Sequence, residues 1–187
     1  MAVSEAAQRR LLRSYMARQE AIAAAGGSVM VRAWNQLDSF DESDVAQFRE
    51  LALPATTVLT RRAAALSAAY LAALLREPVV SATATVAPDF VGPFTRFWGA
   101  IGRGEPFDQA VLAGSARADA AGRNAVVSTA RRVGDQIGSN QITGWRRVLD
   151  ADPCDWCVTV STQTYRSAES ADFGHDRCGC GVTPVLR

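Results

Sequence analysis

Apolar residues recur every three or four positions over most of the first 138 residues, which is the spacing of one helix face. Between residues 3 and 37 this pattern predicts a helix, and the Gly26–Gly27 pair predicts a break within it. The same spacing between residues 41 and 77 predicts a second, longer helix. Because a proline removes a backbone hydrogen bond inside a helix, we expect Pro54 to kink or divide this second helix.

The middle of the chain predicts a connector and two further helices. Residues 79–93 hold β-branched residues and two prolines, and they predict an extended connector that leads into a short aromatic helix. Pro106 then opens another long helix, because proline is tolerated in the first turn. The inner face of this helix is predicted to run from Phe107 to Ile137, and Gly138 is predicted to end it.

The pattern changes after Gln141, where the segment ITGWRRVLD predicts a strand and the following residues mix β-branched with polar side chains. We therefore expect a mainly α protein with two parts. An Ala-rich helical body is predicted over residues 1–138, and a small Cys/His-rich α+β domain is predicted over residues 139–187.

All four cysteines and the single histidine lie within 27 consecutive positions of this C-terminal part. The spacing Cys154-x-x-Cys157 lets two thiolates reach one ion from a tight turn. A structural zinc ion would also staple a segment that is too short to bury a sufficient core by itself. We expect Cys154, Cys157 and His175 to bind it with either Cys178 or Cys180, and His175-x-x-Cys178 repeats the chelating spacing. A four-cysteine site with His175 beside it is the alternative.

Other chemistries of the same residues fit less well. One alternative to the metal site is that the cysteines form disulfides once a particle leaves the cell. Another is that they are unligated thiols buried as small hydrophobic side chains. A zinc deaminase needs a His-x-Glu motif before its cysteines, but His175 follows Cys154 and Cys157 here. A redox pair needs a βαβ setting, which the helical body does not offer. A cysteine protease that pairs His175 with a thiol stays a weak alternative, so we expect no enzymatic activity.

The overall composition is that of an ordinary globular chain, with 48% apolar residues and a formal net charge of +1. This balance argues against strong unspecific attraction to nucleic acid or to an anionic membrane. All 20 basic residues are arginine, and 34 residues are alanine, a bias that indicates a GC-rich bacterial or phage genome. A local excess of three positive charges over residues 107–149 offers a DNA patch, although the solvated face of an amphipathic helix explains it as well. Its arginines are Arg117, Arg123, Arg131, Arg132, Arg146 and Arg147.

The N-terminal residues carry charges where a signal peptide needs an apolar run, so we expect no export signal. The longest weakly polar stretch, residues 63–75, is short and flanked by Arg62 and Arg76, so no membrane segment is expected. Folding in a reducing cytosol favours a metal site over a disulfide framework for the clustered cysteines.

Four short motifs in the last quarter of the chain resemble a known family. They are WRRVLD at 145–150, ADPC-x-x-C at 151–157, Y-x-SAES at 165–170 and HD-x-C-x-C at 175–180. Together they resemble the C-terminal domain of Mu-type phage minor head proteins, the MuF family, in the branch found in tailed phages of actinobacteria. The resemblance covers about residues 141–187, and it departs from the commoner family form in having His-Asp rather than His-Pro before the paired cysteines.

This resemblance implies a structural minor capsid protein that is associated with the portal and takes part in head assembly or DNA delivery. It implies the portal protein as the main partner, with packaged DNA and the scaffold or major capsid protein as further partners. The implied location is the capsid interior of the virion, after assembly in the bacterial cytoplasm. The alternatives are a zinc-knuckle nucleic-acid-binding protein and a capsid or scaffold maturation protease.

Overall fold

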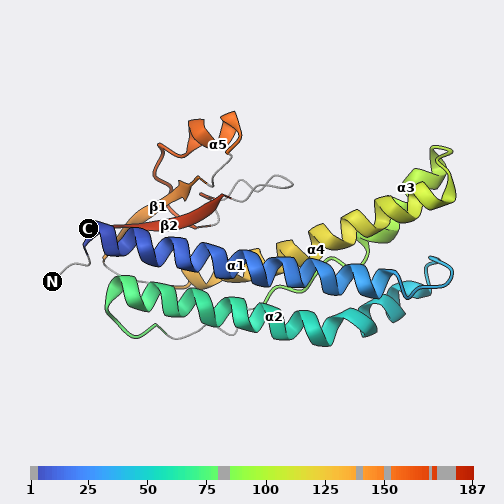
Figure 1. The fold of residues 1–187 in the computed structure, drawn as a ribbon, viewed down its shortest axis with the longest axis horizontal. Helices are drawn as coiled ribbons and strands as arrows, with labels where there is room; N and C mark the ends of the chain where they lie inside the picture. Colours follow the sequence, from blue (N-terminus) through green and yellow to red (C-terminus); the bar gives the residue numbers. More distant parts are fainter. Residues whose placement is uncertain (1–3, 80–84, 138–140, 150–152, 169, 172–179) are drawn as a thin grey trace. The chain divides into compact units, whose positions relative to one another are not determined.

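A computed structural model describes residues 4–79, 85–137, 141–149, 153–168, 170–171 and 180–187, and the fold is mainly helical (Figure 1). A small two-stranded sheet follows the long helices in the chain; its first strand lies where the sequence predicts one, whereas its second strand is not among the predicted elements. The elements in chain order are α1 (Glu5–Trp34), α2 (Asp44–Leu75), α3 (Gly92–Gly102), α4 (Phe107–Asp135), β1 (Ile142–Val148), α5 (Asp155–Val160) and β2 (Gly181–Leu186).

Helix α1 continues through its glycine pair, so the predicted break at Gly26–Gly27 is wrong. A Cβ atom on Gly26 would lie 2.8 Å from the carbonyl oxygen of Gly122 in α4, and a Cβ on Gly122 would overlap the Gly26 carbonyl. The two glycines therefore allow the backbones of α1 and α4 to touch. Their weak helix propensity, about 1 kcal/mol each relative to alanine, is offset by this close packing.

Helix α2 likewise continues through Pro54 and is not divided there. Pro54 and the residue four positions before it, Glu50, both lie on the exposed side of the helix. The Glu50 carbonyl, which loses its N–H partner to the proline, can therefore be hydrated. A proline on the solvent side of a long helix is tolerated for this reason.

Contacts between residues divide the chain into two compact units. Unit 1 consists of residues 1–20, 64–84 and 130–187, and unit 2 consists of residues 21–63 and 85–129. Helices α1, α2 and α4 each contribute residues to both units. These units are defined by contacts, whereas a domain is a part of the chain that folds by itself. The domain boundary expected between residues 138 and 139 therefore stays a prediction.

The core of unit 2 is built around the fully buried indole of Trp34. Four phenylalanine rings surround it at centroid distances of 4.8 to 6.3 Å, from Phe40, Phe48, Phe94 and Phe97. The indole N–H donates to the carbonyl of Val111 at 3.2 Å. Any side chain on Gly114 would overlap the indole ring, so this glycine allows α4 to lie directly against it. Phe107, predicted to start the inner face of α4, is 59% exposed, which corrects that prediction.

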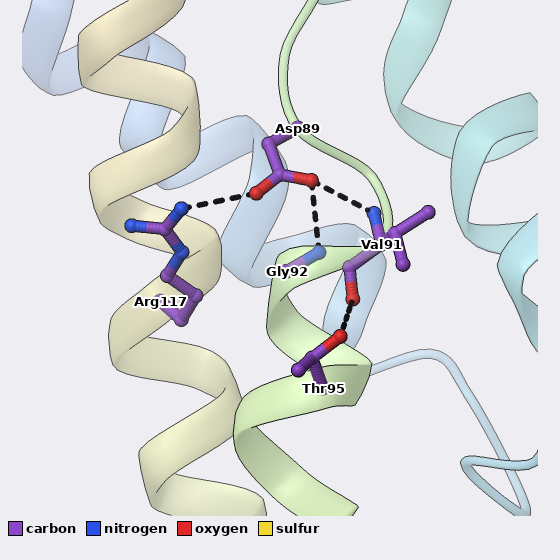
Figure 2. A network of polar contacts seen from close by, with 5 residues as sticks. All are labelled: Asp89, Val91, Gly92, Thr95 and Arg117. Carbon is purple, nitrogen blue, oxygen red and sulfur yellow. Dashed lines mark hydrogen bonds and ion pairs between the residues drawn. The ribbon is translucent and has the colours of Figure 1, made fainter.

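Asp89 joins the start of α3 to α4 within unit 2 (Figure 2). One carboxylate oxygen accepts hydrogen bonds from the backbone N–H groups of Val91 and Gly92, at 3.1 and 2.8 Å. The other accepts from the guanidinium of Arg117 at 3.0 Å. Partial burial raises the pKa of Asp89, but these hydrogen bonds and the Arg117 charge outweigh it and hold the pKa below its ordinary value. The carboxylate therefore caps α3 and binds it to α4.

The second strand of the sheet in unit 1, β2, contains a proline, Pro184, which is unusual inside a strand. Strands β1 and β2 pair antiparallel, with Trp145 opposite Pro184. Both backbone groups of Trp145 bond instead to Tyr165 on the other side of β1, at 2.8 and 2.7 Å. Position 184 thus faces a residue whose hydrogen-bonding groups point away, and the missing N–H of Pro184 costs no ladder bond.

Among the described residues, α2 alone has the length and apolar composition of a membrane-spanning helix, with a mean hydropathy of 1.3 in its most apolar window. Half of that window is buried inside the protein, and core helices of soluble proteins can have the same length and apolar composition.

Candidate metal centre

The first two candidate ligands lie at the start of the short helix α5. Cys154 is the N-cap residue and is exposed, while Cys157 lies inside the helix and is completely buried. The backbone N–H of Cys157 donates to the sulfur of Cys154 at 3.4 Å. Hydrogen bonds of this kind to a sulfur support a metal-bound thiolate, because they balance its negative charge.

The remaining candidates are only partly within the described residues. Cys180 is buried and directly precedes β2, whose first residue, Gly181, pairs with Val148 of β1. His175 and Cys178 lie outside the described residues. No group of three or more histidine, cysteine or acidic side chains is close enough to share a metal ion in the part of the chain that the structure describes. The structure therefore brings Cys154 and Cys157 together, does not group the described Cys180 with both of them, and leaves His175 and Cys178 untested.

The donor chemistry of the described cysteines fits zinc. Two thiolates at Cys-x-x-Cys spacing, with an N–H group directed at the first sulfur, are soft ligands suited to a tetrahedral zinc site. Cys157 has no exposed surface, whereas Cys154 is exposed, so an ion held by both would be covered by protein on its Cys157 side.

A buried arginine links β1 to the cysteine helix. The side chain of Arg147 is only 3% exposed, and its guanidinium carbon lies 5.7 Å from the ring centroid of Trp156 in α5. The same guanidinium donates to the backbone carbonyl of Ala171 at 3.4 Å. Arg147 thus connects the strand, the helix and the Ala171 segment through one planar group, in a cation–π contact with Trp156.

The segment between α5 and the Ala171 region is fixed by local hydrogen bonds. Tyr165 pairs with β1 through its backbone, and its hydroxyl donates to the carbonyl of Val160 at the end of α5. The hydroxyls of Ser167 and Ser170 lie 2.6 Å apart, and each accepts the backbone N–H of the other residue, at 3.1 and 2.9 Å. These two serines close a tight turn.

Three contacts attach the C-terminal segment to the helices of unit 1. The indole of Trp145 packs on Gly134 of α4, where a Cβ atom would lie 2.8 Å from the ring. The hydroxyl of Thr183 in β2 is 2.9 Å from that of Tyr70 in α2. The carboxylate of Asp135 accepts the backbone N–H of Ala168 at 2.6 Å. The segment is therefore held by docking on helices, in addition to any metal.

The arginines counted in the sequence as a DNA patch have different surroundings. Arg117 pairs with Asp89 at 3.0 Å, and Arg123 pairs with Asp119 at 2.8 Å. Arg147 is buried under Trp156 and does not face solvent. The local charge excess therefore overstates the positive surface available to phosphates.

Sequence reasoning missed Arg147 as a structural residue because arginine is mostly exposed in proteins and the segment was counted by charge alone. The available signal was its position two residues after Trp145 in a strand, which places both side chains on one face of the sheet. Of the four tryptophans, Trp34 and Trp145 are buried, while Trp98 and Trp156 are 50% and 43% exposed.

Comparisons with protein families, with curated proteins and with solved structures found no match to the chain.

Proposed function

We propose that this protein is a structural minor capsid protein of the MuF type, bound near the portal inside a phage head. The observation that carries the proposal is that two of the motifs behind the resemblance, WRRVLD and ADPC-x-x-C, supply contacts that organise the C-terminal segment. Trp145 anchors β1 on α4, Arg147 joins β1 to Trp156, and Cys154 caps the helix that contains Cys157. The motif residues behind the resemblance are thus residues that hold this segment in its fold.

The proposed cofactor is a structural zinc ion held by Cys154 and Cys157 together with two donors among His175, Cys178 and Cys180. Its role would be to join the start of α5 to the residues that precede β2. The chain would supply ligands and shielding, and the metal would add stability rather than reactivity.

The alternative function of nucleic-acid binding receives less support. Arg117 and Arg123 are engaged with acidic side chains and Arg147 is buried, so fewer charges are available for phosphate contacts. Phosphate binding scales with the number of such contacts and weakens with salt. A purely electrostatic DNA-binding role would therefore be weak.

The proposal is tested by native mass spectrometry of the full chain mixed with the portal ring encoded in the same genome. We expect a fixed number of chains per ring, each carrying about one zinc ion. Cys154→Ser should lose the zinc, whereas Ser161→Ala, which changes the residue after the same short helix, should keep it. Absence of any portal complex would overturn the head-protein assignment, and a metal-free native chain would overturn the zinc assignment.

Scaffold cleavage and DNA binding are measured in parallel. Cleavage of a co-expressed scaffold that stops in His175→Ala would favour the protease alternative. DNA affinity that falls steeply between low and high salt, without a portal complex, would favour the nucleic-acid alternative.

A further inference from the structure

Unit 2 has an apolar groove on its surface between α1 and α2. The groove encloses about 640 Å³ and is lined by Ala25, Ser28, Val29 and Arg32 of α1 and by Ala55, Val58 and Leu59 of α2. None of these residues belongs to the candidate metal centre. Val58 is 48% exposed, a high value for a β-branched residue in the middle of a long helix. The groove therefore presents apolar surface that none of the described residues covers.

The exposed apolar surface continues along α2. Leu51, one turn before Ala55, is 40% exposed, and the positions 51, 55 and 58 lie on one side of the helix because they are four and three residues apart. The buried side of α2 is formed by other residues, such as Phe48 and Ala52. Helix α2 thus has two apolar sides, and only one of them packs inside unit 2.

One arginine, Arg32, lines the groove, and a second, Arg62, lies one helical turn beyond the groove residue Val58 along α2. Ala23 of α1 packs near Ala63 of α2, and Ala33 packs in one cluster with Phe48, so the two helices run antiparallel. Arg32 therefore lies toward the Leu51 end. At the opposite end, Arg62 follows Val58 by four residues and extends the same stripe.

Arg32 and Arg62 are both exposed, and neither forms an ion pair with any of the described residues. An apolar floor bounded by two available cations has a clear chemical complement, which is an aliphatic surface bounded by two carboxylates. From residue 51 to residue 62 the stripe covers eleven steps along the helix, or about 16 Å at 1.5 Å per residue. This length matches about three turns of a helix.

We infer that the α1/α2 groove binds an amphipathic helix of a different protein, with aliphatic residues along one face and an acidic residue near each end of that face. Two helices lining a shallow apolar groove are a common receptor for such a helix. A second copy of this chain is a poorer occupant, because its groove would bring arginines against arginines. The inference stands independently of the proposed function, since it uses neither the cysteines nor the resemblance.

The test uses the full-length protein and a labelled 16-residue helical peptide, in which leucines at helical spacing are flanked by two glutamates eleven residues apart. Fluorescence anisotropy should show saturable binding. Val58→Glu should weaken it at least tenfold, because it places a charge on the apolar floor. The matched control is Leu112→Glu, which changes a residue that is 61% exposed but does not line the groove, and which should leave binding unchanged.

Charge exchange tests the acidic part of the inference. A peptide with lysines in place of both glutamates should bind the native protein at least tenfold more weakly. The affinity of this lysine peptide should be restored with the double variant Arg32→Glu/Arg62→Glu. Circular dichroism verifies that all variants keep their helix content. Equal affinity for the two peptides, or equal binding by Val58→Glu and the native protein, would overturn the inference.

Two further outcomes would also overturn it. Binding to vesicles of phosphatidylcholine and phosphatidylglycerol that is lost in Val58→Glu would assign this face to a membrane. A dimer in analytical ultracentrifugation that is lost in the same variant would assign it to a second copy of the chain.

Discussion

The hydroxyl groups of Tyr70 and Thr183 lie 2.9 Å apart, although 113 positions separate the two residues in the chain. Both side chains are buried, and Tyr70 also stacks on Tyr15 with ring centroids 4.3 Å apart. This single hydrogen bond joins the longest helix to the last strand. It shows that β2 is packed into the helical core of unit 1.

Removing both partners of this pair should cost less than the sum of removing each one alone. Tyr70→Phe leaves the Thr183 hydroxyl buried without its partner, and we expect a loss of about 1–2 kcal/mol in the free energy of unfolding. Thr183→Val should cost a similar amount. In the double variant Tyr70→Phe/Thr183→Val the loss should be clearly smaller than the sum, as measured by urea unfolding. Strict additivity would mean that the hydrogen bond does not contribute.

The same tyrosine predicts how stability depends on alkaline pH. Burial raises the pKa of Tyr70 to about 12, from an ordinary value of 10.0. Because the folded-state pKa is the higher one, the protonated phenol stabilises the fold below pH 10, and this contribution is lost as pH rises toward 12. The melting temperature of the native protein should therefore fall above pH 10, and the melting temperature of Tyr70→Phe should fall less steeply over the same range. Burial also raises the pKa of Tyr15, so Tyr70→Phe should not abolish the effect.

At acidic pH the cap on α3 should weaken. The pKa of Asp89 is lowered in the folded state, so its contribution is present above the unfolded pKa and is lost as pH falls through the folded value. At neutral pH, Asp89→Asn should destabilise the protein by about 0.5–1 kcal/mol, since the carboxylate is partly exposed and its ion pair is screened. The difference from the native protein should shrink below about pH 4. The control is Asp38→Asn, because Asp38 is exposed and accepts no hydrogen bond from the residues that the structure describes.

Alanine should be costly at a glycine in the contact between α1 and α4 and harmless at a glycine outside it. Gly122→Ala places a methyl group against the Gly26 carbonyl and should cost about 1–3 kcal/mol, because backbone atoms must move apart. Gly102→Ala, at the end of α3, meets no atom within 4 Å and should be neutral or slightly stabilising. Thermal unfolding of both variants measures the difference. A Gly122→Ala variant as stable as the native protein would contradict the close backbone contact.

The long helices could be predicted from sequence because each has a regular apolar stripe, and α2, α3, α4 and β1 lie where the pattern places them. The errors come from residues whose local propensity is overridden by tertiary contacts. The break predicted at Gly26 is absent because this glycine lies where the backbones of α1 and α4 touch. Strand β2 is not among the predicted elements, and its Pro184 faces a position without ladder bonds. At the candidate metal centre, Cys154 and Cys157 were found by spacing, whereas the role of Arg147 depends on Trp156 and is not visible in any local pattern.

The contact between Arg147 and Trp156 can be tested by keeping the positive charge at position 147 and removing the planar guanidinium group. Arg147→Lys keeps the positive charge but loses the planar group that lies over the indole and donates to Ala171. We expect it to destabilise the protein by about 1–2 kcal/mol and to shift the fluorescence of Trp156, which is already 43% exposed, toward longer wavelength. To isolate this signal, the exposed Trp98 is replaced by phenylalanine, and emission is quenched with iodide, which reaches the exposed Trp156 but not the buried Trp34 and Trp145. Arg146→Lys is the matched control, because Arg146 neighbours Arg147 in β1 but is exposed. If Arg147→Lys and Arg146→Lys gave the same emission spectrum and stability, the guanidinium contact would not be what holds α5 on the sheet.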